Sequence, residues 1–331
     1  MPSIKLSNGT RFDSEPGESL LDAASRASVV MAYSCGTGRC SSCKCKVIEG
    51  KSTALHEELG LSEREKADGW VLSCVRSAIS DMSLEVEDLG GLTIPQIKTL
   101  PCRIHALERL ATDVIKVVLR LPPTSEFSFL PGQYIDVIAQ GGIRRSYSLA
   151  NASAVDNLLE LHIRAVPGGL MSEYWFRQAK VNDLLRLNGP LGTFFLREMA
   201  GLDLVFLATG TGIAPVKSML ESIEILPIEN KPRSITVYWG GRKPSDLYWD
   251  VNSIKGVHRY VPVLSRAGSD WSGAKGYVQQ VLLAEISDLS ETVVYACGSN
   301  AMIHSAKDLL LTAGLPEQNF LSDAFVCSSS T

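Results

Sequence analysis

The chain has 331 residues, of which 45% are hydrophobic and 21% are charged, and its formal net charge is -4. This balance is typical of a globular protein with roughly two or three domains, and it excludes a disordered chain and a broadly basic nucleic-acid-binding protein. No apolar run approaches the roughly 20 residues that span a bilayer, and the first residues do not form a signal-peptide core. We therefore expect a cytoplasmic protein with neither nucleic acid nor membrane as a partner.

The first predicted domain, residues 1–92, mixes short strands with helices. Its periodicity predicts these elements: strands at 4–6, 10–12, 44–48 and 82–86, and helices at 19–27 and 62–67. Ser19 is suitably placed to cap the first helix, because a serine hydroxyl can accept a hydrogen bond from the amide groups of the first turn. We predict an α+β roll with a stiff loop, rich in glycine and cysteine, on one edge.

The second predicted domain, residues 99–200, is rich in strands. Between Leu158 and Val166, apolar residues alternate with Glu160, His162 and Arg164, so one face of this strand is expected to be buried and the other wet. His162 is expected to point outward, and none of the five histidines has the spacing of a metal ligand. Several short strands with few helices predict a small antiparallel β-barrel.

The third predicted domain, residues 201–331, alternates strands with helices. The strands are predicted at 202–207, 235–239, 260–264 and 293–297, and the helices at 216–225, 278–285 and 301–312. Such alternation predicts a doubly wound α/β domain with a parallel sheet.

Four of the eight cysteines have the spacing that binds a plant-type [2Fe–2S] cluster. Cys35, Cys40 and Cys43 follow one another as C-x4-C-x2-C, and Cys74 comes after 30 intervening residues. A zinc site is the rival interpretation, but zinc ligands usually come as two close pairs. Inert thiols are the other alternative.

The remaining cysteines carry less information. Cys45 is expected to be a small buried residue of a strand, since buried cysteine behaves as a small hydrophobe. Cys102 and Cys327 have no predicted role.

Two motifs of the second domain resemble the ferredoxin–NADP reductase superfamily. Arg145-Ser146-Tyr147-Ser148 is similar to its R-x-Y-S element, and the sequence PGQY at 131–134 is similar to the strand that precedes it. This order predicts FAD: Arg145 can pair with a pyrophosphate, Tyr147 can lie on the isoalloxazine, and Ser148 can donate near N5. An ordinary core role for Tyr147 remains the alternative.

A glycine turn follows in the same domain. Gly168 and Gly169 precede a predicted helical stretch that includes Met171 and Ser172. Its backbone N–H groups are expected to face the flavin diphosphate, because helix N-termini favour anions.

The third domain contains a second phosphate-binding turn. Residues 209–215 read TGTGIAP and resemble the G-T-G-I-A-P element of the same superfamily; its candidate nucleotide-binding residues are Gly210, Thr211, Gly212 and Pro215. Cys297 and Gly298 stand at the end of a predicted strand, where parallel sheets bind ligands. The resemblance implies that Cys297 lies beside the nicotinamide, and a merely buried strand-end cysteine is the alternative.

The resemblance also concerns the chain's last residues and the choice of nicotinamide. It implies that Phe325, in the sequence SDAF at 322–325, covers the flavin. Arg242, Lys243, Ser265 and Arg266 could bind the 2′-phosphate of NADPH or could be plain surface charge. NADH is favoured, because reductases that resemble this chain mostly use it.

Taken together, the chain resembles reductases with an N-terminal plant-type ferredoxin domain, a β-grasp roll, followed by FAD and NAD domains. The resemblance implies NAD(P)H-dependent electron transfer through FAD and a [2Fe–2S] cluster to an electron-acceptor protein. Residues 33–35, 67–74 and 322–326 look most like the reductases of 3,6-dideoxysugar synthesis, and this resemblance implies a pyridoxamine-phosphate dehydrase as that partner. Two alternatives remain: the oxygenase component of an aromatic-ring dioxygenase or di-iron monooxygenase, and a carrier or redox sensor without nicotinamide turnover.

Overall fold

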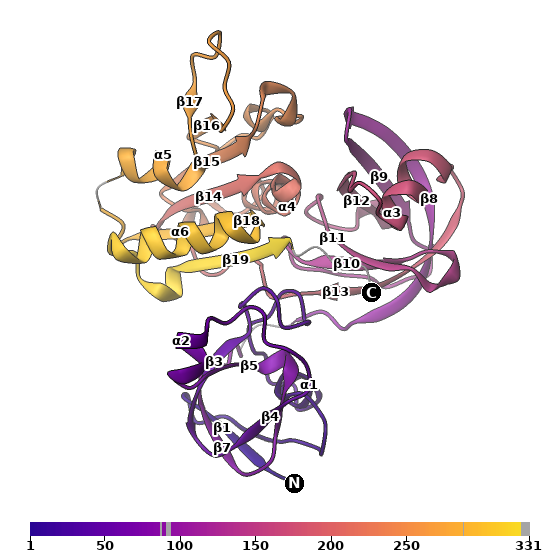
Figure 1. Ribbon diagram of the computed structural model, residues 1–331. Helices are drawn as coiled ribbons and strands as arrows, with labels where there is room; N and C mark the ends of the chain where they lie inside the picture. The colour runs from indigo at the N-terminus through magenta and orange to yellow at the C-terminus, as the bar shows by residue number, and fades with distance from the viewer. Residues whose placement is uncertain (87, 91–93, 287, 326–331) are drawn as a thin grey trace. The chain divides into compact units, whose positions relative to one another are not determined.

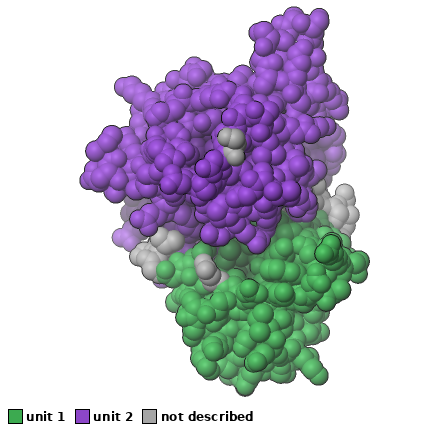
Figure 2. All heavy atoms as spheres, turned by 90° about the vertical axis from the view of Figure 1, so that its left-hand side faces the viewer, with its two compact units in different colours: residues 1–93, 323–331 green, residues 94–322 purple. Residues whose placement is uncertain are grey.

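The computed structural model describes residues 1–86, 88–90, 94–286 and 288–325. Contacts divide the chain into two compact units, residues 1–93 with 323–331 (unit 1) and residues 94–322 (unit 2), as Figure 2 shows. Cys327 lies outside the described residues. No helix in the described part of the chain is long and apolar enough to cross a membrane.

Unit 1 is built on a five-stranded mixed sheet in the order β2-β1-β7-β3-β5 (Figure 1). Its strands are β1 (Ser3–Leu6), β2 (Arg11–Asp13), β3 (Lys44–Glu49), β5 (Trp70–Leu72) and β7 (Met82–Glu85), and β4 (Ser52–Ala54) pairs with β6 (Arg76–Ala78). The helices are α1 (Leu20–Arg26) and α2 (Glu63–Ala67). Ser19 caps α1, because its Oγ accepts a hydrogen bond of 3.0 Å from the N–H of Asp22.

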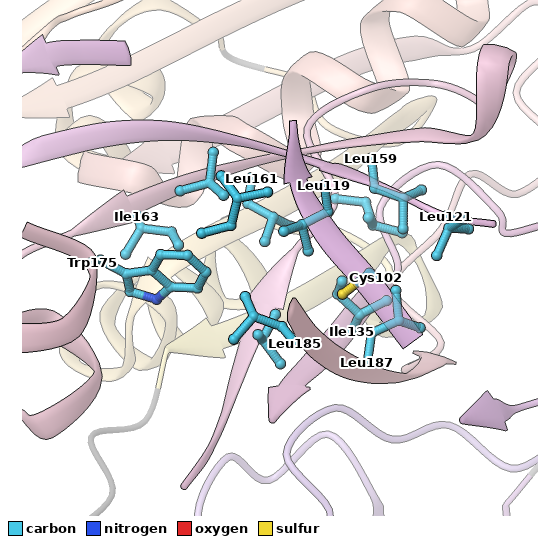
Figure 3. Packing of buried hydrophobic residues seen from close by; sticks show 14 of the residues in the cluster. Cys102, Leu119, Leu121, Ile135, Leu159, Leu161, Ile163, Trp175, Leu185 and Leu187 are labelled. Atoms are coloured by element: carbon cyan, nitrogen blue, oxygen red, sulfur yellow. The ribbon is translucent and has the colours of Figure 1, made fainter. Parts of the chain in front are cut away.

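The first part of unit 2 is an antiparallel sheet closed into a barrel. The strands are β8 (Lys98–Ala111), β9 (Val114–Arg120), β10 (Tyr134–Ile138), β11 (Arg144–Ser148), β12 (Leu158–Arg164) and β13 (Leu184–Leu191). They follow the order β11-β10-β13-β8-β9-β12, and an antiparallel bridge between Leu149 and Leu161 joins the edge formed by β11 to β12. Inward side chains, among them Leu161, Trp175 and Leu187, fill the interior (Figure 3).

The second part of unit 2, called here the parallel-sheet lobe, has the strand order β17-β16-β15-β14-β18-β19 (Figure 1). Its elements are β14 (Asp203–Thr209), α4 (Ile213–Glu224), β15 (Ser234–Gly241), β16 (Arg259–Leu264), β17 (Ala274–Lys275), α5 (Val278–Glu285), β18 (Thr292–Ser299), α6 (Asn300–Thr312) and β19 (Phe320–Phe325), of which only residues 320–322 belong to unit 2. Strand β14 pairs in parallel with both β15 and β18. Leu204, Phe206 and Ala208 of β14 pack with α4, while the contacting pair α5 and α6 also covers the sheet.

The structure confirms the predicted fold class: an α+β roll, an antiparallel barrel and a doubly wound parallel sheet. It corrects one expectation about the barrel. His162 does not point into solvent but is buried, with only 7% of its surface exposed. The outer face of β12 is covered by the parallel-sheet lobe, a neighbour that strand periodicity cannot reveal.

The barrel interior gives a matched stability prediction on one strand. Leu187 is fully buried on β13, whereas Leu184 on the same strand is 57% exposed. We expect Leu187→Ala to lower the free energy of unfolding by about 2–5 kcal/mol because it leaves a cavity in a packed core. Leu184→Ala should change it by less than about 0.5 kcal/mol. Urea unfolding followed by tryptophan fluorescence measures both, and equal losses would contradict the assigned core.

Candidate functional site

The four predicted cluster cysteines come together in unit 1 as two pairs. The Sγ atoms of Cys43 and Cys74 lie 3.2 Å apart, and the thiols of Cys35 and Cys40 are hydrogen-bonded to each other. A separation of 3.2 Å is too long for a disulfide, whose sulfurs lie about 2.05 Å apart. A [2Fe–2S] cluster needs two thiolates on each of two irons, and two thiol pairs match that requirement.

The pairing argues against the zinc interpretation. A structural zinc site brings four ligands around one metal ion. The four sulfurs here form two pairs instead, Cys35 with Cys40 and Cys43 with Cys74. The geometry therefore fits two irons held by two pairs.

Each pair contains one thiol that ionises more readily than its partner. The hydrogen bond with Cys40 lowers the pKa of Cys35 to about 5, and the same bond raises the pKa of Cys40. Likewise, the bond between Cys43 and Cys74 raises the pKa of Cys43 and lowers that of Cys74. A metal replaces the shared proton and takes both sulfurs as thiolates.

Backbone amides of the loop point at these sulfurs. The N–H of Cys35 donates to Sγ of Cys40 at 3.4 Å, and the N–H of Thr37 donates to Sγ of Cys35 at 3.4 Å. Gly38 has φ +75°, and a Cβ there would lie 2.7 Å from the carbonyl oxygen of Glu57, so the loop needs glycine. Such N–H groups stabilise the negative charge of a thiolate-bound cluster.

Two buried carboxylates that the sequence analysis missed support the loop. Glu58 accepts from the N–H of Leu72 at 2.7 Å and forms a 2.6 Å ion pair with Arg76, on either side of Cys74. Asp323 accepts a short hydrogen bond from Ser34, the residue before Cys35, and burial raises the pKa of Asp323 to about 6. Asp323 is distant in sequence from the cysteine motif, and Glu58 lies between Cys43 and Cys74 without any spacing signal, so only the fold reveals the two roles.

The predicted flavin residues lie on one strand of the barrel. Arg145, Tyr147 and Ser148 are on β11, where Arg145 is half-exposed and Ser148 is buried. The hydroxyl of Tyr147 accepts a 3.0 Å hydrogen bond from Nε1 of Trp175, and burial raises the pKa of Tyr147 to about 12. This contact fixes the ring that is predicted to lie on the isoalloxazine.

The glycine turn after β12 leads into the helix that carries Trp175. Gly169 caps α3 (Leu170–Glu173), which continues as a π-helical turn over Tyr174–Gln178. The side chain of Met171 packs in the barrel core, and Oγ of Ser172 accepts from the N–H of Val166 at 2.8 Å. Met171 can therefore offer a phosphate only its backbone N–H, whereas Ser172 can also donate its hydroxyl hydrogen. A π-helical turn often marks a functional site, but no sequence signal predicted this one.

The predicted nucleotide turn and Cys297 meet at one edge of the parallel sheet. A Cβ on Gly212 would lie 2.2 Å from the carbonyl oxygen of Cys297, and one on Gly298 would lie 2.0 Å from Oγ1 of Thr209. These contacts are possible only for glycine. Cys297 is fully buried at the end of β18, which is compatible both with a place beside the nicotinamide and with a structural role. Pro215 lies in the first turn of α4, as predicted.

The charged residues considered for NADPH line one open pocket of about 490 Å³. Arg242, Lys243 and Arg266 share it with Arg164, Asp113 and Asp246. The N–H groups of Ser265 and Arg266 donate to the carbonyl oxygens of Gly241 and Arg242 at 2.9 and 3.0 Å, and these bonds hold the two loops together. The structure thus assembles a cationic pocket next to the nucleotide turn.

Arg164 is a further candidate that the sequence analysis assigned only to the wet face of a strand. A Cβ on Gly210 would lie 2.7 Å from its Nη1, so its guanidinium reaches the nucleotide turn. Its Nε lies 3.1 Å from a carboxylate oxygen of Asp113, and its Nη2 is buried without a hydrogen-bond partner among the described residues. An arginine at this turn suits a diphosphate.

Phe325 ends β19 and is 38% exposed. It belongs to unit 1, whereas the flavin residues of β11 belong to unit 2. Its role as a cover for the flavin remains a prediction.

Comparison with known protein families agrees with this geometry. Residues 4–78 match the 2Fe-2S iron-sulfur cluster binding domain, residues 101–196 the oxidoreductase FAD-binding domain, and residues 206–308 the oxidoreductase NAD-binding domain. The chain is therefore an NAD(P)H-dependent iron–sulfur flavoprotein oxidoreductase that transfers electrons by way of FAD and a [2Fe–2S] cluster.

Similar proteins cover the whole chain. It is 44% identical to CDP-6-deoxy-L-threo-D-glycero-4-hexulose-3-dehydrase reductase of Yersinia pestis, over 98% of this chain and 99% of that protein. It is 32% identical to a terephthalate 1,2-dioxygenase reductase component of Comamonas sp, over 96% and 95%. Among solved structures, Amycolatopsis cytochrome P450 reductase GcoB aligns with a TM-score of 0.77 and 29% identity, over 98% and 99%. The chain belongs to the family of reductases that these proteins represent.

The cysteine pairs give a second prediction. Cys40→Ser should abolish the visible absorption of the cluster and the paramagnetic signal after dithionite treatment, because one iron loses a thiolate. Flavin reduction by NADH should persist, since the predicted flavin residues of β11 and the predicted nicotinamide residues lie in unit 2. The matched control is Cys45→Ala, because Cys45 is fully buried in the core of unit 1 and lies outside both pairs. Loss of the cluster in that control, or its survival in Cys40→Ser, would refute the ligand set.

Proposed function

We propose that this chain is a CDP-6-deoxy-3,4-glucoseen reductase, which supplies electrons from NADH to the pyridoxamine-phosphate dehydrase of CDP-3,6-dideoxysugar synthesis. The observation that carries the proposal is the 44% identity to a reductase of such a dehydrase over nearly the full length of both chains. The dioxygenase reductase component matches an equal span at 32%. This difference favours the sugar pathway over the oxygenases.

The chain supplies binding and orientation for three groups. When bound, the nicotinamide provides a hydride, the flavin divides its two electrons, and the [2Fe–2S] cluster passes them on singly. The cluster is held by Cys35, Cys40, Cys43 and Cys74. In our proposal it belongs to a domain spanning residues 1–92, followed by a flavin domain at 99–200 and a nicotinamide domain at 201–331. We also place the protein in the cytoplasm, where disulfides are rare and cysteines stay available as ligands.

In the barrel, the proposed roles follow from the positions on β11. Arg145 pairs with the flavin diphosphate, Tyr147 lies against the isoalloxazine, and Ser148 donates near N5. The bond from Trp175 to Tyr147 supports this role, since it fixes the tyrosine ring. Gly168 and Gly169 let the backbone amides that follow approach the diphosphate.

In the parallel-sheet lobe, residues 210–212 receive the nicotinamide diphosphate at the start of α4, with Arg164 as an additional cation. Cys297 lies beside the nicotinamide in this proposal, and Phe325 covers the flavin until the nicotinamide arrives. No acid, base or nucleophile is needed, because the residues act by placement and by excluding water.

The partner proposal gives the third prediction. The assay contains NADH and the reductase without oxygen. Adding the matching CDP-6-deoxyhexulose dehydrase and its substrate should raise the rate of NADH oxidation at least about tenfold. The reason is that a specific partner binds with at least about 1.4 kcal/mol more favourable free energy than a wrong one. Terephthalate dioxygenase with terephthalate should raise the rate less than about twofold. Cys40→Ser should abolish the stimulation. Equal or greater stimulation by the dioxygenase would assign the chain to the oxygenase reductases.

The cationic pocket gives the fourth prediction. We expect kcat/KM to be higher for NADH than for NADPH, with the pocket of Arg242 and Arg266 allowing residual use of NADPH. Arg266→Ala should lower kcat/KM for NADPH by about tenfold or more and for NADH by less than about threefold, because only NADPH carries the 2′-phosphate. Steady-state assays of flavin-mediated ferricyanide reduction measure both. An equal loss with both nucleotides would place Arg266 at the shared diphosphate, and a preference for NADPH in the unchanged protein would overturn the choice of NADH.

A further inference from the structure

We propose that Glu160, His162 and Tyr248 are positioning residues for hydride transfer: they form a polar chain, centred on the buried His162, that holds the nucleotide turn of the parallel-sheet lobe in place against the flavin-binding barrel. The inference rests on transfer from nicotinamide to flavin within unit 2 and does not depend on the partner protein. Glu160, His162 and Tyr248 all lie in unit 2.

The polar chain begins on the outer face of β12. Oε1 of Glu160 lies 2.8 Å from Nε2 of His162 and 3.2 Å from Nζ of Lys217, which belongs to α4 of the parallel-sheet lobe. Lys217 also forms a 2.6 Å ion pair with Glu221 of the same helix. His162 continues the chain through Nδ1, which lies 3.2 Å from the hydroxyl of Tyr248 in the parallel-sheet lobe.

The charges fix the direction of these hydrogen bonds. Burial lowers the pKa of His162, so the ring is neutral near pH 7 and carries one N–H. Burial by itself would raise the pKa of Glu160, but the hydrogen bond with His162 and the charge of Lys217 lower it to about 2, so this carboxylate can only accept. Nε2 of His162 therefore donates to Glu160, and Nδ1 accepts from Tyr248. Each member has one defined orientation.

From Tyr248 the chain reaches the nucleotide turn. The rings of Tyr248 and Trp239 meet edge to face with centroids 5.2 Å apart, and Nε1 of the fully buried Trp239 donates to the carbonyl oxygen of Gly210 at 3.0 Å. The path thus runs from Glu160, on the barrel wall, to Gly210, in the turn that is proposed to hold the nicotinamide diphosphate.

Helix α4 adds a second set of contacts between the same two parts. Nζ of Lys217 donates to the carbonyl oxygen of Ala150 at 2.9 Å, and Oγ of Ser218 donates to that of Asn151 at 2.7 Å. The segment 150–152 begins two residues after Ser148, the last residue of β11, and α4 begins directly after the nucleotide turn. The predicted flavin strand and the nucleotide turn are therefore linked through these hydrogen bonds and a few intervening residues.

Placement matters because hydride transfer needs the reacting atoms about 3–3.5 Å apart, and a 1 Å displacement can cost about 100-fold in rate. An apolar contact would bury the same surface but would let the barrel and the parallel-sheet lobe shift against each other. A hydrogen-bonded chain with one direction gives a single register between the two parts, which is the best-supported role for buried polar groups.

The test uses the full-length holoprotein and anaerobic stopped-flow measurement of flavin reduction by NADH. Tyr248→Phe removes the hydroxyl that reaches His162 and keeps the ring that packs on Trp239. We expect the limiting reduction rate to fall about tenfold, the dissociation constant of NADH to change less than about twofold, and the deuterium isotope effect with 4-deuterated NADH to rise. A purely structural defect would not raise the isotope effect.

The matched control is Tyr238→Phe. Tyr238 donates to Glu285 at 2.7 Å, a tyrosine–carboxylate bond that lies wholly within the parallel-sheet lobe. This variant should keep the rate and isotope effect of the unchanged protein. Equal slowing in both variants, or a Tyr248→Phe rate within about twofold of the unchanged protein, overturns the inference.

A second variant covers the case in which Tyr248→Phe does not fold. Glu160→Gln keeps a hydrogen-bond acceptor for His162 but removes the charge that attracts Lys217. Glu160→Gln should slow flavin reduction and raise the isotope effect in the same way. Where both single variants fold, the double variant should lose less rate than the product of the two single fold-losses, since both residues act through one polar chain. Multiplicative effects oppose the inference. Failure of the unchanged protein to reduce its flavin with NADH would instead remove the reductase function itself.

Discussion

The nucleotide edge of the parallel sheet exists because two backbone loops approach each other more closely than any side chain allows. Gly212 and Gly298 stand where a Cβ would lie 2.2 Å and 2.0 Å from neighbouring atoms. This approach brings the turn that opens α4 against the end of β18, although about 85 residues separate them in the sequence. The predicted nucleotide turn and Cys297 share one edge as a direct consequence, and parallel pairing of β14 with β18 aligns the C-terminal ends of the two strands.

In unit 1, the cysteine loop is held in place by a buried ion pair. Its cysteine loop must hold sulfurs that become thiolates, and Glu58 paired with Arg76 anchors the backbone on both sides of Cys74. The Glu58 carboxylate bonds both a backbone amide and a guanidinium, so its burial leaves no unpaired charge. The two sites therefore depend on different constraints: close backbone packing in the parallel-sheet lobe, and buried ion pairing around the cysteine loop.

The sequence was most informative where the chemistry is local. Cysteine spacing predicted the four thiols that the fold brings together as two pairs, and the capping serine at position 19 marked the start of α1, since three of those cysteines and the cap signal lie within short segments. It failed for Glu58 and His162, whose partners come from distant segments. The alternation of apolar and polar residues along β12 correctly separated its inward face from its outward face. It could not show that the outward, polar face contacts the parallel-sheet lobe. Trp175 was missed for the same reason, because its contact with Tyr147 crosses between separate elements.

Strand β12 shows how one element can serve two interfaces. Its inward residues, Leu159, Leu161 and Ile163, belong to the barrel core, and Leu161 also takes part in the bridge that closes the barrel. Its outward residues, Glu160, His162 and Arg164, each contact a different feature of the parallel-sheet lobe: the helix α4, Tyr248 and the nucleotide turn. Because residues two apart on a strand share a face, these three contacts lie in a row. The strand that shapes the flavin-binding barrel therefore also orients the lobe that delivers the nicotinamide.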